Sequence, residues 1–352
     1  MGTRPEIIKM SPIIRVCEKR GYDYHMIHTG QHYSYEMDGI FFDELSLPKP
    51  KYKLNIGSGT HAEQTGKIML GLEPVFVKEA PDVALVQGDT NSVLAGAVTA
   101  AKLHIKVGHV EAGLRSFDKR MPEELNRVLA DHVSDYLFAP TVVSRGNLLR
   151  EGIRENAIFV TGNTVVDAIQ ENSALFKDRD ILGRLGLEGG DYFLVTLHRA
   201  ENVDDGSRLV KIITALREAS RAFGKPILFP MHPRTRKMIG SFHLDLTGLW
   251  IVDPLSYLDF LRLESEAGLI LTDSGGVQEE ACVLHVPCVT LRENTERPET
   301  VDVGANIVAG VSSGEILASV EVMLNRGRDW VNPYGDGNAG EKILQVLIEK
   351  SM

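Results

Sequence analysis

Cysteine is scarce in this sequence. Only Cys17, Cys282 and Cys288 occur among 352 residues, their number is odd, and no two of them form a CxxC pair. Disulfide frameworks and structural zinc sites need paired or clustered cysteines, so neither is expected. We interpret the three as isolated, buried and reduced thiols, which is typical of a cytoplasmic protein.

Long apolar runs and positive charge are also in short supply. No apolar stretch approaches the roughly 20 residues that cross a bilayer, and the opening residues Met1–Glu6 lack the apolar core of a signal peptide. Lys and Arg number 38 against 48 Asp and Glu, so the formal net charge is −10. An acidic chain without a basic block binds nucleic acid poorly. We therefore expect neither a membrane nor a nucleic acid as partner, although a few local cations suffice to hold a small anion.

Several motifs of nucleotide-binding and hydrolytic enzymes are missing. No GxGxxG follows a predicted strand, and no GxSxG occurs, so a dinucleotide cofactor lacks support. Gly66-Lys67 resembles the end of a P-loop, but Ile68 stands where that motif requires Ser or Thr. The histidines near the N-terminus lack the spacing of a closed zinc site. The sequence therefore predicts neither a cofactor nor a structural metal.

The chain does contain many short apolar runs that alternate with helical patterns. The predicted strands are Tyr24–His28, Val83–Gln87, Lys106–Val110, Tyr136–Phe138, Ile158–Val160, Tyr192–Leu197, Pro226–Phe229, Leu249–Val252, Leu269–Thr272, Cys288–Leu291 and Ile307–Ala309. Continuous apolar runs are typical of strands buried on both faces of a parallel sheet. Strand–helix alternation that occurs twice predicts two doubly wound α/β domains.

Turn residues indicate where the domains meet. We expect an N-terminal domain at residues 1–166 and a C-terminal domain at 167–335, because Thr161-Gly162-Asn163-Thr164 follows the last strand of the first series. The chain opens on Gly2-Thr3-Arg4-Pro5, which is typical of a strand-to-helix turn, but no strand sequence precedes it. Either the start is misassigned, or the first sheet lacks a central strand and is weakened.

Polar residues directly follow many of the predicted strands, and ligands of open α/β sheets bind beyond these carboxyl ends. The segments are Gln87-Gly88-Asp89-Thr90-Asn91, Glu111-Ala112-Gly113-Leu114-Arg115, His198-Arg199, Met231-His232 and Thr272-Asp273-Ser274-Gly275-Gly276. Each alone is more often a helix cap than a catalytic group. Caps do not require carboxylates and imidazoles in both domains, so their joint occurrence favours a ligand site.

A second set of residues suits a diphosphate. Ser274-Gly275-Gly276 precedes a helical pattern, where backbone N–H groups attract phosphate. Glu280 lies one turn further on, within reach of a ribose hydroxyl, unless it is a solvated helix residue. Arg297 offers a fork of donors to a diphosphate or forms an ion pair at the surface. Arg4 and Lys9 flank the first helix start and add positive charge there, although a lysine at such a position is more often solvated.

Several segments together resemble the UDP-N-acetylglucosamine 2-epimerases, most closely the non-hydrolysing, cofactor-independent branch of prokaryotes. They are Gly2-Thr3-Arg4-Pro5-Glu6, Gln87-Gly88-Asp89-Thr90, Val107-Gly108-His109-Val110-Glu111-Ala112-Gly113-Leu114-Arg115, Pro122-Glu123-Glu124-Leu125-Asn126-Arg127, Leu271-Thr272-Asp273-Ser274-Gly275-Gly276-Val277-Gln278-Glu279-Glu280, Thr295-Glu296-Arg297-Pro298-Glu299 and Asn332-Pro333-Tyr334-Gly335-Asp336-Gly337. The resemblance extends over nearly the whole chain.

This resemblance implies a GT-B architecture, in which two Rossmann-like domains face a central cleft and the last helix, 338–352, returns to the first domain. It implies a homodimer that converts UDP-GlcNAc to UDP-ManNAc for surface polysaccharide synthesis. In the family, UDP is eliminated to leave 2-acetamidoglucal and is then added back with C2 inverted.

The resemblance also implies roles for individual residues. The catalytic residues it implies are Asp89, Glu111, Glu123 and His198. The substrate-binding residues it implies are Arg4, Lys9, Ser274, Gly275, Gly276 and Arg297 for the diphosphate, Glu280 for the ribose, and Leu255, through its main chain, and Phe260 for the uracil. In bacterial members a second UDP-GlcNAc activates the enzyme near the equivalents of Gln31, His32, Arg199 and His232.

The sequence departs from the family pattern at three positions. Ala200 stands where members often carry a second basic residue, Leu255 replaces a frequent Gln, and Ser34 replaces a common Gln near the activator residues.

Three rival functions stay open. A hydrolysing relative would release UDP and free ManNAc. A GT-B glycosyltransferase would need an acceptor. A non-catalytic sugar-nucleotide sensor would bind without turnover, although the intact carboxylates and His198 argue against it.

Overall fold

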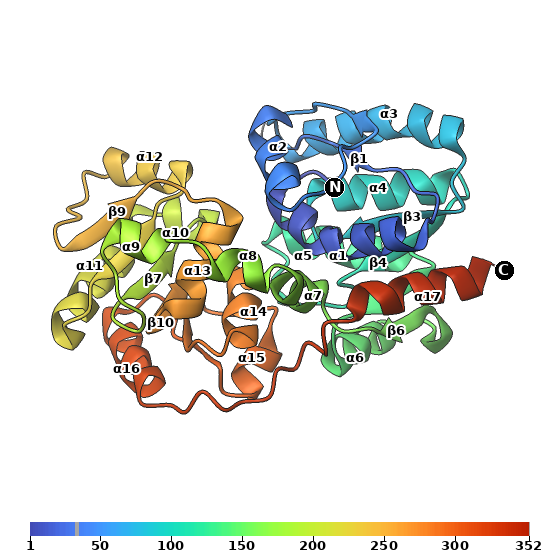
Figure 1. Cartoon of the computed structure of the whole chain (residues 1–352). Helices are drawn as coiled ribbons and strands as arrows, with labels where there is room; N and C mark the ends of the chain where they lie inside the picture. Colours follow the sequence, from blue (N-terminus) through green and yellow to red (C-terminus); the bar gives the residue numbers. More distant parts are fainter. Residues whose placement is uncertain (32–34, 352) are drawn as a thin grey trace. The chain divides into compact units, whose positions relative to one another are not determined.

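The computed structural model describes residues 1–31 and 35–351, which form two α/β units (Figure 1). The first unit holds Met1–Asn172 and Tyr334–Met352, and the second holds Ser173–Pro333. The first unit extends past residue 166, the boundary expected from the sequence, because helix α7 (Thr164–Glu171) packs against α1 (Arg4–Arg20) and α17 (Ala339–Ser351). Each unit contains a parallel sheet flanked by helices, which confirms the predicted fold class.

The sheet of the first unit has four parallel strands in the order β3-β4-β5-β6. These strands are β3 (Val83–Gln87), β4 (Lys106–Val110), β5 (Tyr136–Ala139) and β6 (Ile158–Val160), and a separate parallel pair is formed by β1 (Ile27–His28) and β2 (Tyr52–Lys53). Besides α1, α7 and α17, the first unit contains the helices α2 (Tyr35–Glu44), α3 (His61–Glu79), α4 (Asn91–Lys102), α5 (Pro122–Val133), α6 (Val142–Arg150) and the 3-10 turn η1 (Glu155–Ala157). Gln87 pairs with Val110, and Val110 with Phe138, so the carboxyl ends of β3, β4 and β5 are level.

The first residues of the chain lie beside β1. The Met1 ammonium donates to the Ile27 carbonyl (3.0 Å), and the Thr29 N–H donates back to the Met1 carbonyl (2.9 Å). Pro5 occupies the first turn of α1, where its missing N–H costs nothing. The opening turn is thus held by backbone hydrogen bonds and leads directly into a helix that the core buries.

The second unit has a six-stranded parallel sheet in the order β12-β11-β10-β7-β8-β9. Its strands are β7 (Phe193–Thr196), β8 (Ile227–Pro230), β9 (Leu249–Val252), β10 (Leu269–Thr272), β11 (Cys288–Thr290) and β12 (Asn306–Val308). Its helices are α8 (Ser173–Lys177), α9 (Ile181–Leu185), α10 (Ala200–Val203), α11 (Gly206–Phe223), α12 (Pro233–Ser241), α13 (Tyr257–Glu266), α14 (Gly275–Val283), α15 (Pro298–Asp302) and α16 (Ser313–Leu324). Thr196 pairs with Thr272, which brings the loops after β7 and β10 side by side.

All three cysteines are buried and free of disulfides, as predicted. Burial raises the pKa of the Cys17 thiol to about 11 and that of Cys282 to about 12, so both are protonated and unreactive at neutral pH. Among residues 1–31 and 35–351, no helix has both the length and the apolar character that spanning a bilayer requires. The same residues contain no cluster of three His, Cys, Asp or Glu side chains arranged around a metal position.

Candidate active site

Glu111 stands immediately after β4 in a strained backbone conformation. Its φ is +71°, in the left-handed region that non-glycine residues occupy at a cost of about 1–3 kcal/mol. The N–H groups of Glu111 and Ala112 both donate to the Phe138 carbonyl (3.1 Å each), so the strand ends in a bulge-like turn. This turn aims the Glu111 carboxylate inward, where it is buried.

The charge of Glu111 is balanced by Lys9, which is also buried. The Lys9 ammonium donates to both carboxylate oxygens, at 2.8 and 2.9 Å, and the Gln87 amide donates to Oε2. Helix α1 and strand β3 thereby hold the carboxylate in place. Lys9 is therefore not a solvated helix residue, and diphosphate binding by this residue stays a prediction.

Asp89 follows β3 across the turn at Gly88 and is more accessible. Its side chain is 26% exposed, and its Oδ2 accepts a hydrogen bond from Arg127 Nη2 at 2.5 Å. The Asn126 amide donates to the Asp89 carbonyl (3.0 Å), so α5 holds both the main chain and the side chain of this residue. Asp89 is thus an oriented carboxylate with an open side, as an acid or base needs.

Glu123 lies in the first turn of α5 and is partly buried. The positive end of the helix dipole favours a carboxylate there. Its neighbour Glu124 accepts hydrogen bonds from the N–H groups of Ser116 (3.0 Å) and Phe117 (2.9 Å), which ties the start of α5 to the loop after β4. The three predicted catalytic carboxylates of the first unit therefore sit on neighbouring strand ends and on the helix that follows them.

His109 on β4 and Asp131 on α5 form a buried pair, and sequence reasoning assigned neither a role. The His109 ring contacts the Asp131 carboxylate through Nδ1 (2.7 Å) and the Gly88 carbonyl through Nε2 (2.8 Å). Burial works to lower the pKa of His109, but Asp131 and the Gly88 carbonyl outweigh it, so the pKa is raised. The one feature of the sequence that could have pointed to this pair is a histidine within a strand predicted to be buried.

In the second unit, His198 stands on a loop that Asp273 anchors. The fully buried Asp273 carboxylate accepts the N–H groups of His198 (3.1 Å) and Arg199 (3.0 Å) and the side-chain amide of Asn202 (3.2 Å). The His198 side chain itself is 41% exposed, with its ring centroid 6.2 Å from that of His232. The loop is rigid while the imidazole stays accessible, which suits a proton donor or phosphate ligand.

Ser274, Gly275 and Gly276 form the start of α14. Ser274 is the N-cap, and its hydroxyl accepts the Val277 N–H (3.5 Å). A Cβ at Gly275 would collide with Glu296 Oε1, so a larger residue there requires the buried Glu296 side chain to move. A Cβ at Gly276 would come no closer than 3.9 Å to Ser274 Oγ. The N-terminus of α14, where backbone N–H groups are available to an anion, therefore has open space beside Gly276.

Arg297 belongs to a buried ionic network. Its Nε donates to Glu279 (2.5 Å), and Nη1 lies 3.5 Å from Glu296, which also contacts Arg199 (3.5 Å) and Arg292 (2.9 Å). The alternative of a surface ion pair is therefore wrong, because Arg297 is only 5% exposed. Diphosphate binding by Arg297 stays a prediction.

The residues predicted for ribose and uracil lie in the loop before α13, on α13 and on α14. Leu255 and Phe260 are partly buried and pack against one apolar cluster that includes Val277. Glu280 lies beside the fully buried Glu264, and burial together with the Glu280 charge raises the pKa of Glu264 well above its ordinary value. This contact between Glu264 and Glu280, and the raised pKa of Glu264, were not foreseen from the sequence.

The predicted activator residues are divided between the units. Gln31 is buried in the first unit, where its side-chain oxygen accepts the Ser92 N–H (2.9 Å). Arg199 and His232 lie in the second unit, and His232 caps α12 by accepting the Arg234 N–H (3.2 Å). His32 lies outside the described residues.

Arg4, which is predicted to bind the diphosphate, lies at the start of α1, and its Cζ is 4.9 Å from the centroid of the Phe41 ring.

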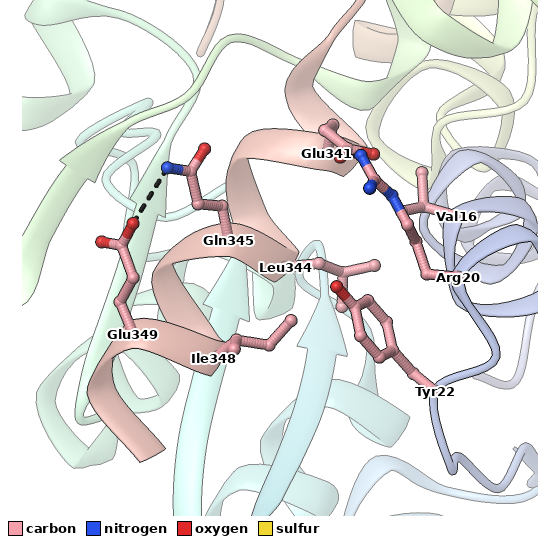
Figure 2. Close-up of a pocket in the computed structure, with 8 residues that line it drawn as sticks. All are labelled: Val16, Arg20, Tyr22, Glu341, Leu344, Gln345, Ile348 and Glu349. Carbon is pink, nitrogen blue, oxygen red and sulfur yellow. Dashed lines mark hydrogen bonds and ion pairs between the residues drawn. The ribbon is translucent and has the colours of Figure 1, made fainter. Parts of the chain in front are cut away.

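A pocket elsewhere on the first unit lies between α1 and α17 and holds none of these residues (Figure 2). An Arg20–Glu341 ion pair crosses it, and the Gln345 amide donates to Glu349 (2.9 Å). Four of its polar side chains are thus paired with one another, and the strand-end residues remain the candidate site.

Comparison with known proteins adds to this geometry. A family model described as UDP-N-acetylglucosamine 2-epimerase matches residues 15–348. The UDP-N-acetylglucosamine 2-epimerase of Methanocaldococcus jannaschii is 58% identical over 99% of this chain and 97% of its own length. A UDP-2,3-diacetamido-2,3-dideoxy-D-glucuronate 2-epimerase of Pseudomonas aeruginosa is 44% identical over 99% of this chain and 98% of its own length.

Solved structures of UDP-GlcNAc 2-epimerases also resemble this chain. The crystal structure of the M. jannaschii UDP-GlcNAc 2-epimerase in complex with UDP-GlcNAc and UDP superposes with a TM-score of 0.95, covering 99% of this chain and 98% of that one at 58% identity. The Neisseria meningitidis UDP-GlcNAc 2-epimerase bound to UDP-GlcNAc superposes with a TM-score of 0.91 at 34% identity, with the same coverage.

Proposed function

The chain belongs to the UDP-N-acetylglucosamine 2-epimerase family and is thus an isomerase, and on that premise we propose that it interconverts UDP-GlcNAc and UDP-ManNAc without hydrolysis. UDP leaves C1 as a proton leaves C2, which gives 2-acetamidoglucal, and UDP then adds back with C2 inverted. The product serves surface polysaccharide synthesis. The reaction uses no cofactor in this proposal, because the proton and the diphosphate are both returned to the sugar.

The chemistry requires acid–base groups in the first unit. The C2 proton is barely acidic, so its removal is coupled to departure of the C1 oxygen and needs a positioned base. Inversion needs proton delivery to the opposite face, and hence a second group. The observation that supports the proposal most strongly is that Asp89 and Glu111 are held on adjacent strand ends by Arg127 and Lys9, respectively. Together with Glu123 they divide the acid and base duties.

The second unit supplies the nucleotide site in this proposal. His198 stabilises or protonates the departing phosphate, and the start of α14 at Ser274–Gly276 binds the diphosphate with Arg297 and, from the first unit, Arg4 and Lys9. Glu280 binds the ribose, and the Leu255 main chain and Phe260 hold uracil. The proposed reaction also requires that water be kept from the glucal while UDP and the glucal are held together.

Assembly and activation form part of the proposal. Helices α3 and α5 flank α4 (Figure 1) and expose Leu70, Val77, Leu125 and Leu129, each at least 48% accessible, which supports a homodimer formed through this face. A second UDP-GlcNAc would act near Gln31, Arg199 and His232. Light scattering of wild type and of Leu125→Glu tests the dimer, and a monomeric wild type would overturn it.

Incubation with UDP-GlcNAc in deuterated water, followed by NMR, tests the proposed reaction. UDP-ManNAc carrying deuterium at C2 is the expected product. Free ManNAc would indicate the hydrolysing rival, and a glycosyltransferase would leave C2 protonated. Binding with no turnover would indicate a sensor. A parallel arm with UDP-2,3-diacetamido-2,3-dideoxy-D-glucuronate, the substrate named for the P. aeruginosa relative, tests the choice of hexosamine.

A further inference from the structure

His109 is fully buried, and both of its ring nitrogens face acceptors. Nδ1 lies 2.7 Å from Asp131 Oδ1, and Nε2 lies 2.8 Å from the Gly88 carbonyl oxygen. A carbonyl cannot donate, and Asp131 is an ionised acceptor because His109 and Arg115 hold its pKa low against the effect of burial. Each nitrogen therefore carries a proton, and the ring is an imidazolium.

Asp131 connects this imidazolium to two further elements. Its other oxygen accepts Arg115 Nη1 (2.7 Å) and the Gly113 N–H (3.2 Å). Arg115 in turn pairs with Glu151 (2.6 Å). The pair thus joins the turn after β3, the turn after β4 and the C-terminal half of α5.

These are the elements that carry the candidate acid–base groups. Gly88 directly precedes Asp89, and Gly113 follows Glu111 by two residues. The same helix α5 also contacts Asp89 directly, through Asn126 on its carbonyl and Arg127 on its carboxylate. The Gly88–Asp89 turn is therefore fixed at two points that both depend on the position of α5.

We propose that His109 is a positioning residue for this reaction: its two N–H groups clamp the Gly88–Asp89 turn to Asp131 and so set the direction of the Asp89 carboxylate. This inference rests on the proposed function. Without the Nε2–H donor, the partly buried Gly88 carbonyl loses this hydrogen bond, and the peptide before Asp89 is held less firmly. A misplacement of about 1 Å at an acid–base group costs about 10²-fold in rate.

Two substitutions separate the two halves of the clamp. An Asn amide nitrogen sits near the position of ring Nδ1, and a Gln amide nitrogen near that of Nε2. His109→Asn therefore keeps the donor to Asp131 and loses the donor to Gly88, whereas His109→Gln does the reverse. We expect kcat of H109N to fall about 10²-fold with KM nearly unchanged, and kcat of H109Q to be restored at least tenfold relative to H109N.

Leu137→Ala is the matched control, because Leu137 is the buried residue that pairs with His109 in the sheet register. It removes buried apolar contacts and lowers stability without touching the clamp, so its kcat stays near that of wild type. Equal losses of kcat in H109N and H109Q, or an equal loss in L137A, would reduce His109 to a structural residue and overturn the proposal.

Two readouts do not depend on turnover. The ¹⁵N spectrum of the His109 ring in wild type is expected to show two protonated nitrogens at pH 7, and hydrogen exchange of the Gly88 amide, which donates to the Val110 carbonyl (3.1 Å), should accelerate in H109N but not in H109Q. A neutral ring, or unchanged exchange in H109N, contradicts the proposal. Wild type could show the doubly protonated ring and the slow Gly88 exchange and yet not turn over UDP-GlcNAc. In that case the proposed function is wrong, while the hydrogen bonds of His109 to Gly88 and Asp131 are confirmed.

Discussion

Lys9 and Glu111 form a buried ion pair in which the ammonium donates to both carboxylate oxygens, at 2.8 and 2.9 Å. The two residues are 102 positions apart and join α1 to the end of β4. Because Glu111 is also held in a left-handed backbone conformation, this pair fixes a strained carboxylate at the point where the sheet of the first unit ends.

Removal of Lys9 should therefore destabilise the first unit. Lys9→Met leaves the Glu111 charge buried and uncompensated, and we expect a loss of about 3–5 kcal/mol. The double variant K9M/E111Q should recover part of this loss, because no buried charge is left unpaired. Both tryptophans, Trp250 and Trp330, lie in the second unit, so hydrogen exchange of the β4 amides is the measurement of choice. A loss below 1 kcal/mol in K9M would mean that the pair is not buried in solution.

Neutral substitutions of the carboxylates should separate catalysis from nucleotide binding. Asp89→Asn and Glu111→Gln are expected to lower kcat by about 10²–10⁴-fold. Both variants should still bind UDP, because the proposed uridine contacts, and the diphosphate contacts of Ser274–Gly276 and Arg297, belong to the second unit. Steady-state kinetics and calorimetry with UDP check this. Near-normal rates in both variants would show that other groups move the proton.

The two glycines of α14 should respond differently to alanine. Gly275→Ala places a Cβ against the buried Glu296, and overpacking of this kind costs about 1–3 kcal/mol. Gly276→Ala meets nothing closer than 3.9 Å in the free protein, so its stability should be unchanged while its UDP affinity falls. Tryptophan fluorescence during urea unfolding and UDP titration measure the two effects. UDP binding to G276A with wild-type affinity would exclude this helix start as the diphosphate site.

Stability of the first unit should depend on pH through His109 and Asp131. The pKa of His109 is raised, so its contribution is complete below the ordinary value of about 6.5 and is lost as pH rises through the raised value. The pKa of Asp131 is lowered, so its contribution is present above about 3.8 and is lost as pH falls through the lowered value.

The stability difference between wild type and H109Q should accordingly shrink as pH increases above neutrality. Hydrogen exchange of the β4 amides at several pH values, corrected for intrinsic rates, gives this difference. A difference that is constant from pH 6 to 10 would mean that the ring is neutral throughout.

The fold was largely predictable because its strands are continuous apolar runs. Val83–Gln87, Lys106–Val110 and Leu249–Val252 have the predicted bounds. The two-residue strand Tyr52–Lys53 was missed because it is too short to show a period, and the predicted Tyr24–His28 is reduced to Ile27–His28.

The candidate site was less predictable than the fold. Its strand-end residues follow from the general rule for open sheets, but their partners do not. The contact of Lys9 with Glu111, and that of His109 with Asp131, depend on how distant elements pack. No local spacing in the sequence encodes such contacts, so the sequence offered for Lys9 only a diphosphate contact or a solvated position on the helix.

The central claim is that the anomeric C–O bond is broken and remade at this site, and positional isotope exchange tests it most directly. UDP-GlcNAc carrying ¹⁸O in the bridge between C1 and the β-phosphate is incubated with the enzyme and examined by ³¹P NMR. The account predicts that the label scrambles into the non-bridging β-phosphate positions while C2 gains deuterium. Deuterium gain at C2 with the ¹⁸O retained in the bridge would contradict it.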